Sequence, residues 1–283
     1  RQNNKLQLEM YYYIANTLMK YKNGDYAKDN SLFIASFLIK TNRSFLEKDN
    51  IKWIDLLYNA GVIAKSRTDL DTALKIFSLC EHLILLDESS IARELYLDIQ
   101  LEYMQCQFIS GKESEAKERY ELLIRKFTDK DNLIKIKLKY IYFYSYSANW
   151  EKVISLGIEI LNNLNYRFDT RFIIFDLLKS RALYSRKNIE KIKDAPLITD
   201  KRILTILEVL TIMFPATNRI DPKKFTLVTL KLAILSKKYG NSMYSCIGYA
   251  SYCHVLFFIF KDYEKGDRLQ QITLDILDNN KIM

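Results

Sequence analysis

The chain has 283 residues, of which 49% are apolar and 27% are charged. This balance is typical of a soluble protein with a sizeable core, and the length allows one large domain or two ordinary ones. Glycine (7) and proline (3) are both scarce. Because sheet proteins of this size need many glycine- and proline-marked turns, the composition argues against a sheet protein and favours helices.

The longest apolar run, residues 252–260, is far shorter than the roughly 20 residues that a membrane-spanning helix needs. We therefore expect no membrane insertion. The first residue is Arg1 and no signal region follows it, so we expect a segment of a longer protein. The four cysteines form no CxxC pair and lie in apolar helical contexts. They are predicted to be reduced core residues of a cytoplasmic protein.

The net charge of +9 raises the question of nucleic-acid binding. In residues 112–119, however, lysines and glutamates alternate, which predicts a solvated helix face with pairs four residues apart. The densest basic stretch is 179–193, with one glutamate among six basic residues. A nucleic-acid partner is therefore unlikely to be the reason for the charge.

Apolar residues recur with helical spacing along the whole chain. In chain order, helices are predicted at about 5–22, 26–40, 47–66, 70–86, 89–110, 113–127, 131–147, 150–164, 169–187, 200–213, 222–239, 242–260 and 263–279. The one shift in composition, from Asp194 to Asp200, predicts a loop. We expect one elongated domain over 1–283, with 188–200 as the place where it could subdivide.

A repeated pattern organises these helices. In one predicted hairpin, Gly61 and Ala73 allow two helices to approach closely, and Phe77 fills the space beside them. Small or equivalent residues recur at positions 73, 116, 153 and 266, after predicted turns at Arg67–Asp69, Gly111, Ala148–Trp150 and Lys261–Tyr263. A further turn is predicted at Asn23–Tyr26. This spacing is typical of an irregular tetratricopeptide array, and it predicts an all-α, right-handed superhelix of helical hairpins.

Several blocks resemble one family. The stretch Leu235–Ser242 is similar to a block of large bacterial signalling proteins, in which a predicted AAA-type ATPase precedes a degenerate tetratricopeptide-like region. Protein kinase, GAF, PAS or histidine-kinase modules flank that pair. Further matching blocks are Tyr12–Leu18, Asn59–Phe77, Ile198–Asp200, Gly248–Ala250 and Phe260–Gly266. The resemblance implies a non-catalytic regulatory or sensor scaffold of a signal-transduction ATPase or kinase.

Residues 239–242 also have a purely structural interpretation. Gly240 can take the left-handed conformation that ends one helix. Asn241 or Ser242 can then cap the next helix by accepting a hydrogen bond from a free backbone N–H. This interpretation predicts a tight hairpin, and it is favoured over a ligand site.

The sequence shows no catalytic, cofactor-binding or metal-binding centre. It contains neither GxxxxGK[ST] nor GxGxxG, so nucleotide hydrolysis is not expected from this segment. The only histidines are His82 and His254, and a zinc site needs about four converging ligands. His254 is predicted to pack between paired helices, although Cys246 and Cys253 share a helical face nearby.

Function is predicted to reside in a groove lined by the first helix of each hairpin, where aromatic residues and scattered polar groups suit a protein or peptide helix. The alternatives are a neighbouring domain of the parent chain in the groove, or a peptide-binding transcription regulator of the quorum-sensing type. An enzyme is the least favoured class. The predicted lining residues are Tyr58, Val62, Lys65, Leu101, Gln105, Phe108, Tyr142, Ser145, Tyr146, Ser251, Val255 and Phe258.

Overall fold

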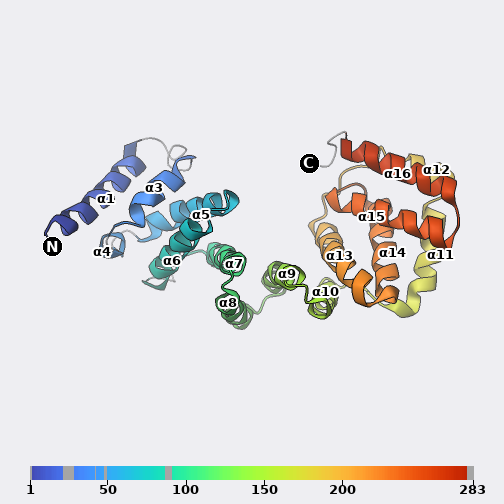
Figure 1. The fold of residues 1–283 in the computed structure, drawn as a ribbon, viewed down its shortest axis with the longest axis horizontal. Helices are drawn as coiled ribbons and strands as arrows, with labels where there is room; N and C mark the ends of the chain where they lie inside the picture. The colour runs from blue at the N-terminus through green and yellow to red at the C-terminus, as the bar shows by residue number, and fades with distance from the viewer. Residues whose placement is uncertain (1, 22–28, 42, 48–49, 87–90, 279–283) are drawn as a thin grey trace. The chain divides into compact units, whose positions relative to one another are not determined.

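The computed structural model describes residues 2–21, 29–41, 43–47, 50–86 and 91–278, and these form helices without any strand (Figure 1). The all-α prediction is confirmed for them. The predicted turn at Asn23–Tyr26 lies outside the described residues. The chain divides into two compact units, 1–128 and 129–283.

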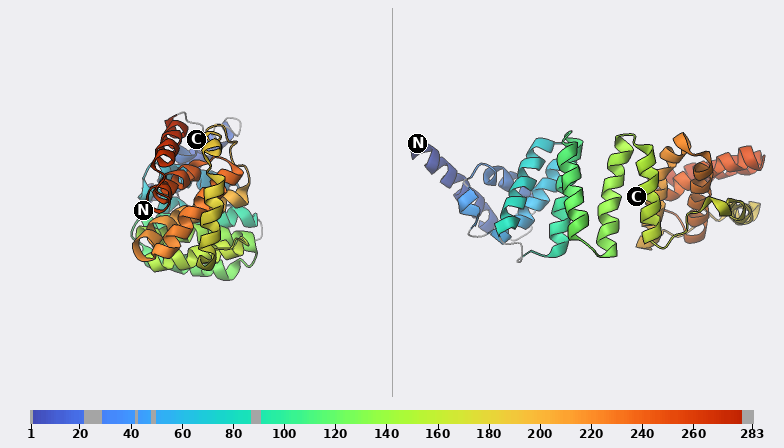
Figure 2. Two further views of the ribbon diagram at one scale, coloured as in Figure 1. Left: turned by 90° about the vertical axis from the view of Figure 1, so that its right-hand side faces the viewer. Right: turned by 90° about the horizontal axis from the view of Figure 1, so that it is seen from below.

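Unit 1 is a succession of neighbouring helices. Each packs against the next in the order α1, α3, α5, α6, α7 and α8, and the right-hand view of Figure 2 shows the later ones side by side. Its core holds the fully buried Trp53 and Phe77. The helices of this unit are α1 (Gln2–Tyr21), α3 (Ser31–Leu38), α4 (Arg43–Leu46), α5 (Asn50–Ser66), α6 (Leu70–Leu86), α7 (Arg93–Ile109) and α8 (Glu113–Lys126).

Unit 2 contains three successive hairpins, α9/α10, α13/α14 and α15/α16, and an insertion that follows α10. Helix α13 packs directly on α10, whereas α11 packs on α14 and α12 on α16. The elements are α9 (Lys130–Tyr146), α10 (Trp150–Asn163), η3 (Thr170–Phe172), α11 (Ile173–Leu183), α12 (Arg186–Glu190), α13 (Lys201–Ile220), α14 (Pro222–Tyr239), α15 (Met243–His254), the π-helical turn η4 (Val255–Ile259) and α16 (Tyr263–Asp278).

The predicted hairpin turns share one backbone geometry. Thr68, Gly111, Ala148 and Lys261 all have positive φ, between 52° and 79°. Each lies five residues before the small or equivalent position of its hairpin. In three of the turns the next N–H bonds the carbonyl oxygen five residues back, as in Asn149 to Tyr144 at 2.8 Å. This is the Schellman arrangement that ends a helix, so the predicted repeat positions correspond to a repeated local structure.

The close approach predicted in the first of these hairpins is confirmed. A Cβ atom on Gly61 would lie 2.7 Å from the ring of Phe77, which is tighter than real contacts allow. Gly61 therefore lets α5 approach the fully buried Phe77 ring of α6, and Ala73 is buried on the same helix as that ring.

The largest differences from the predicted helices are in unit 2, whereas in unit 1 the short helix α4 was not predicted. The helix predicted at 200–213 continues to Ile220 with Pro215 inside it; Pro215 is exposed, so the ring meets solvent, and the neighbouring turns hold the helix together. The helix predicted at 169–187 is divided into η3, α11 and α12, and the one predicted at 242–260 ends in the π-helical turn.

Helix α13 is long and apolar enough to cross a membrane by length and composition, and it alone qualifies among the described residues. Half of the qualifying segment is buried inside unit 2. Its buried residues, such as Leu207 and Leu210, belong to a helix that contacts α10, α14 and α15. Packing within the unit therefore accounts for much of its apolar character.

The loop at 191–200, between α12 and α13, is hydrogen-bonded to the turn between α14 and α15 within unit 2. The N–H of Asn241 donates to Pro196 O at 2.7 Å, and the N–H of Ile198 donates to Asn241 O at 2.9 Å. The Asn241 side chain donates to Ile192 O at 2.8 Å and accepts from the Tyr249 hydroxyl at 2.8 Å.

The predicted tight turn at residues 239–242 and the cap by Ser242 are confirmed, whereas Gly240, with ψ of −161°, has an extended positive-φ conformation in place of the predicted left-handed helical one. Gly240, with φ of 118°, follows α14, and the Ser242 side chain caps α15 by accepting from the N–H of Ser245. Asn241 instead ties the preceding loop to the hairpin.

Candidate functional site

Six of the predicted groove residues lie on the neighbouring helices α5 and α7 of unit 1. The Lys65 ammonium forms an ion pair with Glu102 and donates to Gln105 Oε1 at 2.8 Å. Tyr58, on the same helix as Lys65, is half-buried, and burial followed by the charges of Asp98 and Glu102 raises its pKa. Phe108, one turn beyond Gln105, is also half-buried.

Unit 2 places Tyr142 and Tyr146 beside a carboxylate on another helix. The Tyr142 hydroxyl of α9 donates to Glu208 Oε1 of α13 at 2.7 Å. The Tyr146 ring stacks on that of Tyr142, with centroids 6.4 Å apart, and is 71% exposed. Tyr244 of α15 faces the same carboxylate: burial and then Glu208 raise its pKa to about 12. We call Tyr142, Tyr146, Glu208 and Tyr244 the tyrosine–glutamate site.

Burial and the Glu208 carboxylate also raise the pKa of Tyr142. Burial, followed by the hydrogen bond to Glu208 and the charge of that carboxylate, raises the pKa of Tyr142 far above its ordinary value. Both phenols therefore stay protonated at neutral pH, and Tyr142 remains a hydrogen-bond donor to Glu208.

Three predicted lining residues are buried, and their assignment to an open groove is wrong. Ser251 is 4% exposed and its hydroxyl donates to Gly248 O at 3.0 Å within the same helix. Leu101 and Val255 are 1% and 4% exposed. Helical spacing identifies the face of a helix, but the neighbouring helices decide how wide a strip of that face remains open.

Phe258 is 76% exposed at the end of the hairpin α15/α16. His254 stacks on it, with ring centroids 6.2 Å apart, and is itself exposed. The prediction that His254 packs between paired helices is therefore wrong. The π-helical turn that follows His254 contains one more residue per turn than an α-helix, so the side chains after it point in other directions than α-helical spacing predicts.

An apolar groove of about 610 Å³ runs between α15 and α16. Its lining includes His254 together with exposed apolar side chains such as Met243 (65%), Leu274 (52%) and Leu277 (50%). Exposed apolar area of this kind is common at protein interfaces.

Ion pairs account for many of the basic side chains. Two of the six basic residues in 179–193 pair with acidic residues of α16: Arg186 with Glu264 at 2.6 Å and Lys193 with Asp275 at 2.5 Å. Glu190, within the same stretch, pairs with Arg268 of α16 at 2.5 Å. These contacts neutralise part of the basic stretch.

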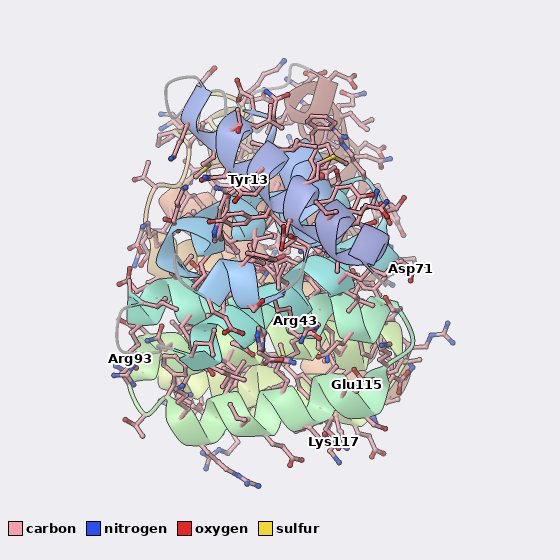
Figure 3. All side chains as sticks on the ribbon, turned by 90° about the vertical axis from the view of Figure 1, so that its left-hand side faces the viewer. Tyr13, Arg43, Asp71, Arg93, Glu115 and Lys117 are labelled. Carbon is pink, nitrogen blue, oxygen red and sulfur yellow. The ribbon has the colours of Figure 1, made fainter. Side chains whose placement is uncertain are left out.

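The predicted solvated face of α8 holds for part of its residues. Glu115 and Lys117 are exposed, as Figure 3 shows. Arg119, in contrast, is 13% exposed; it pairs with Glu81 of α6 and donates to Gln107 Oε1 at 2.9 Å. This arginine is a structural cross-link within unit 1.

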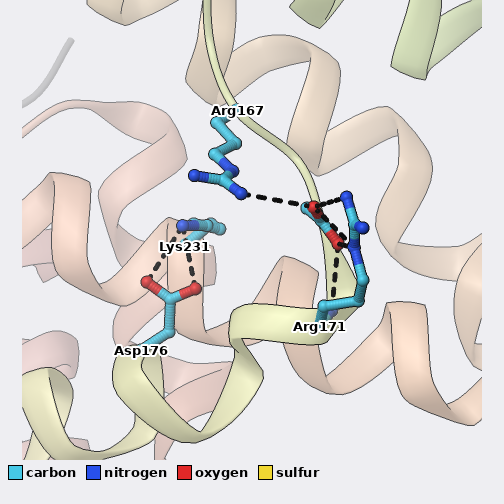
Figure 4. Close-up of polar contacts among 5 residues, drawn as sticks. Arg167, Arg171, Asp176 and Lys231 are labelled. Carbon is cyan, nitrogen blue, oxygen red and sulfur yellow. Dashed lines mark hydrogen bonds and ion pairs between the residues drawn. The ribbon is translucent and has the colours of Figure 1, made fainter.

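A second cluster of ion pairs supports the insertion in unit 2 (Figure 4). Lys231 of α14 pairs with the buried Asp176 of α11 at 2.8 Å. Asp169 caps η3 and accepts from Arg171 at 2.8 Å, which lowers the pKa of that carboxyl to about 2. The Lys231–Asp176 pair joins α14 to α11, whereas the Asp169–Arg171 pair is local to the start of η3.

The cysteines are buried free thiols, as predicted. Burial raises the pKa of Cys106, Cys246 and Cys253 to about 11, and that of Cys80 rises further. A thiol with such a pKa is a poor nucleophile at neutral pH. Within the described ranges, no group of three or more His, Cys, Asp or Glu side chains could hold a metal ion.

Sequence reasoning missed Glu208 and Tyr244. Each lies on a helix that was predicted, but Glu208 is 66 residues from its partner Tyr142, and no local pattern links them. The one available signal was the charged residue Glu208 itself, within the otherwise mostly apolar segment 203–213.

No family model, no characterised protein and no solved structure matches this chain. The fold is therefore described from its own packing, and the family resemblance of the sequence blocks stays a prediction.

Proposed function

We propose that this segment is a non-catalytic regulatory scaffold of a bacterial signal-transduction ATPase or kinase. It binds a protein, a peptide or a neighbouring domain through side chains on α5 and α7 of unit 1 or on α9, α13 and α15 of unit 2, and it transmits that binding to the catalytic module. The observation that supports a scaffold best is the recurrence of one left-handed turn at Thr68, Gly111, Ala148 and Lys261, each five residues before the small or equivalent position of its hairpin, as expected for repeated helical hairpins.

The binding face is supported by the aromatic residues that stay open. Tyr146 is 71% exposed although it stacks on the half-buried Tyr142. Tyrosine contributes strongly to protein interfaces because a rigid ring offers both apolar area and a hydroxyl. The acid–base pair Lys65–Glu102 and Gln105 give the corresponding helices of unit 1 a polar surface.

The test begins with the complete open reading frame. A phosphate-binding loop upstream, or kinase and sensor modules in the same frame, is the expected result; a frame with neither contradicts the signalling role. In the full-length protein, Tyr146→Ala is then expected to change ATP turnover or kinase output, with exposed Glu151→Ala on α10 as the matched control. Equal output from the wild type and both variants would refute transmission through this face.

A further inference from the structure

The carboxylate of Glu208 has an unusual environment for this chain. It is half-buried on α13, and the Tyr142 hydroxyl donates to it at 2.7 Å while Tyr244 faces it from α15. Both neighbours are neutral phenols. Two neutral donors lower the cost of partial burial, but they leave the negative charge uncompensated.

Comparable carboxylates in this protein have a cation beside them. Glu102 pairs with Lys65, Glu81 with Arg119 and Asp176 with Lys231 at 2.8 Å. Glu208 forms no ion pair with any described residue. Since an attraction between unit charges near a protein surface remains substantial at contact distance, the place beside Glu208 is favourable for a cation from outside the chain.

The surrounding rings suit the same kind of group. Tyr146 continues the aromatic surface of Tyr142 into solvent, with the two rings 28° from parallel. The face of an aromatic ring attracts a cation, and arginine also stacks on it through its planar guanidinium. A guanidinium beside Tyr146 would be able to reach a carboxylate that is already fixed in orientation by the Tyr142 hydroxyl.

We infer that the tyrosine–glutamate site binds the guanidinium or ammonium group of an arginine or lysine side chain in a partner peptide, with Glu208 as counterion and Tyr146 as the exposed aromatic contact. The inference rests on the proposed function, and it specifies the chemistry of the partner. A basic ligand must overcome the net charge of +9, so binding by long-range attraction alone is not expected and a local site is required.

The experiment titrates the full chain with a capped glycine–arginine–glycine peptide and follows backbone amide resonances. The same peptide with citrulline, which keeps the shape and loses the charge, is the ligand control. We expect millimolar binding of the arginine peptide and a loss of about tenfold with citrulline, because citrulline can still donate to the Glu208 carboxylate but loses the attraction between the two opposite charges. Equal binding of the two peptides overturns the inference.

Three variants locate the site. Glu208→Gln keeps an acceptor for Tyr142 and is expected to weaken binding about tenfold; Tyr146→Ala, at an exposed position, is expected to weaken it about threefold. Glu151→Gln removes the same charge elsewhere in unit 2 and should leave binding unchanged. If Glu208→Gln fails to fold, the weaker binding expected for Tyr146→Ala and for the citrulline peptide still tests the inference. A loss of affinity in Glu151→Gln equal to that in Glu208→Gln overturns the assignment of the site.

Free arginine is titrated in parallel to distinguish an arginine side chain of a peptide from the free amino acid as the ligand. Binding of the capped peptide at least as tight as that of free arginine supports a peptide side chain, whereas tighter binding of the free amino acid overturns that assignment. Failure here is distinct from failure of the proposed function. If Tyr146→Ala changes the output of the full-length protein but the arginine peptide does not bind, the scaffold role stands and the basic-ligand inference fails.

Discussion

Replacing Gly240 by alanine tests the packing of the loop 192–198 against the hairpin α14/α15. Gly240 has φ of 118° and ψ of −161°, a region that side-chain-bearing residues rarely adopt. An added Cβ would also overlap the carbonyl oxygen of Pro196. That oxygen accepts the Asn241 N–H, so relief of the overlap separates the loop from the hairpin.

The magnitude follows from these contacts. Backbone strain for a non-glycine residue in this region costs roughly 1–3 kcal/mol. The two backbone hydrogen bonds between the loop and Asn241 contribute about 1 kcal/mol each. Gly240→Ala is therefore expected to lower the free energy of unfolding of unit 2 by about 3–5 kcal/mol.

The assay is urea denaturation followed by circular dichroism and by hydrogen exchange of unit 2 peptides. The matched control has the opposite sign: Ala148, also in unit 2, is a non-glycine residue with φ of 54°, so Ala148→Gly is expected to stabilise by up to about 1 kcal/mol. A loss below about 1 kcal/mol in Gly240→Ala would refute the reasoning, because it would show that the loop does not constrain this residue.

Three further outcomes follow from the packing. Arg119→Met is expected to destabilise unit 1 by about 2 kcal/mol because it leaves partly buried acceptors without their cation. The control Lys117→Met, at an exposed position, should change stability by less than about 0.5 kcal/mol. Calorimetry measures both variants, and equal effects would contradict the role of Arg119 as a cross-link. Tyr244 and Tyr252 have pKa values raised to about 12 by burial above an unfolded value of about 10, so their contribution to stability is complete below pH of about 10 and is lost as pH rises through about 12. An alkaline denaturation series with no decline in that window would refute their burial. The four cysteines should react with a thiol reagent at pH of about 8 only after unfolding, as mass spectrometry can show, and rapid labelling of the native chain would contradict their raised pKa values.

The sequence alone predicted much of the local structure. The turns at Thr68, Gly111, Ala148 and Lys261, the hairpin at Gly240 and most helix ends are confirmed. These features depend on groups only a few residues apart: a left-handed residue, a capping side chain and the carbonyl groups of the last helical turn. Short-range geometry of this kind is determined by residues that are close together in the sequence.

Candidate groove residues were predicted with less success. Tyr146 and Phe258 are open, but Ser251 is buried and His254 is exposed, contrary to the expectation for each. Periodicity gives the direction of a side chain around its helix axis. It does not give the positions of the neighbouring helices, which decide whether that direction leads to solvent or to core.

The sequence by itself determined where helices begin and turn and which small residues permit close approach, because those features are set by nearest neighbours. Only the tertiary structure decided that α11 and α12 cover α14 and α16, that α13 continues past Pro215, and that Glu208 lies beside Tyr142 and Tyr244. Such contacts join residues far apart in the chain, and their gain in burial and hydrogen bonding exists only once the helices have packed together.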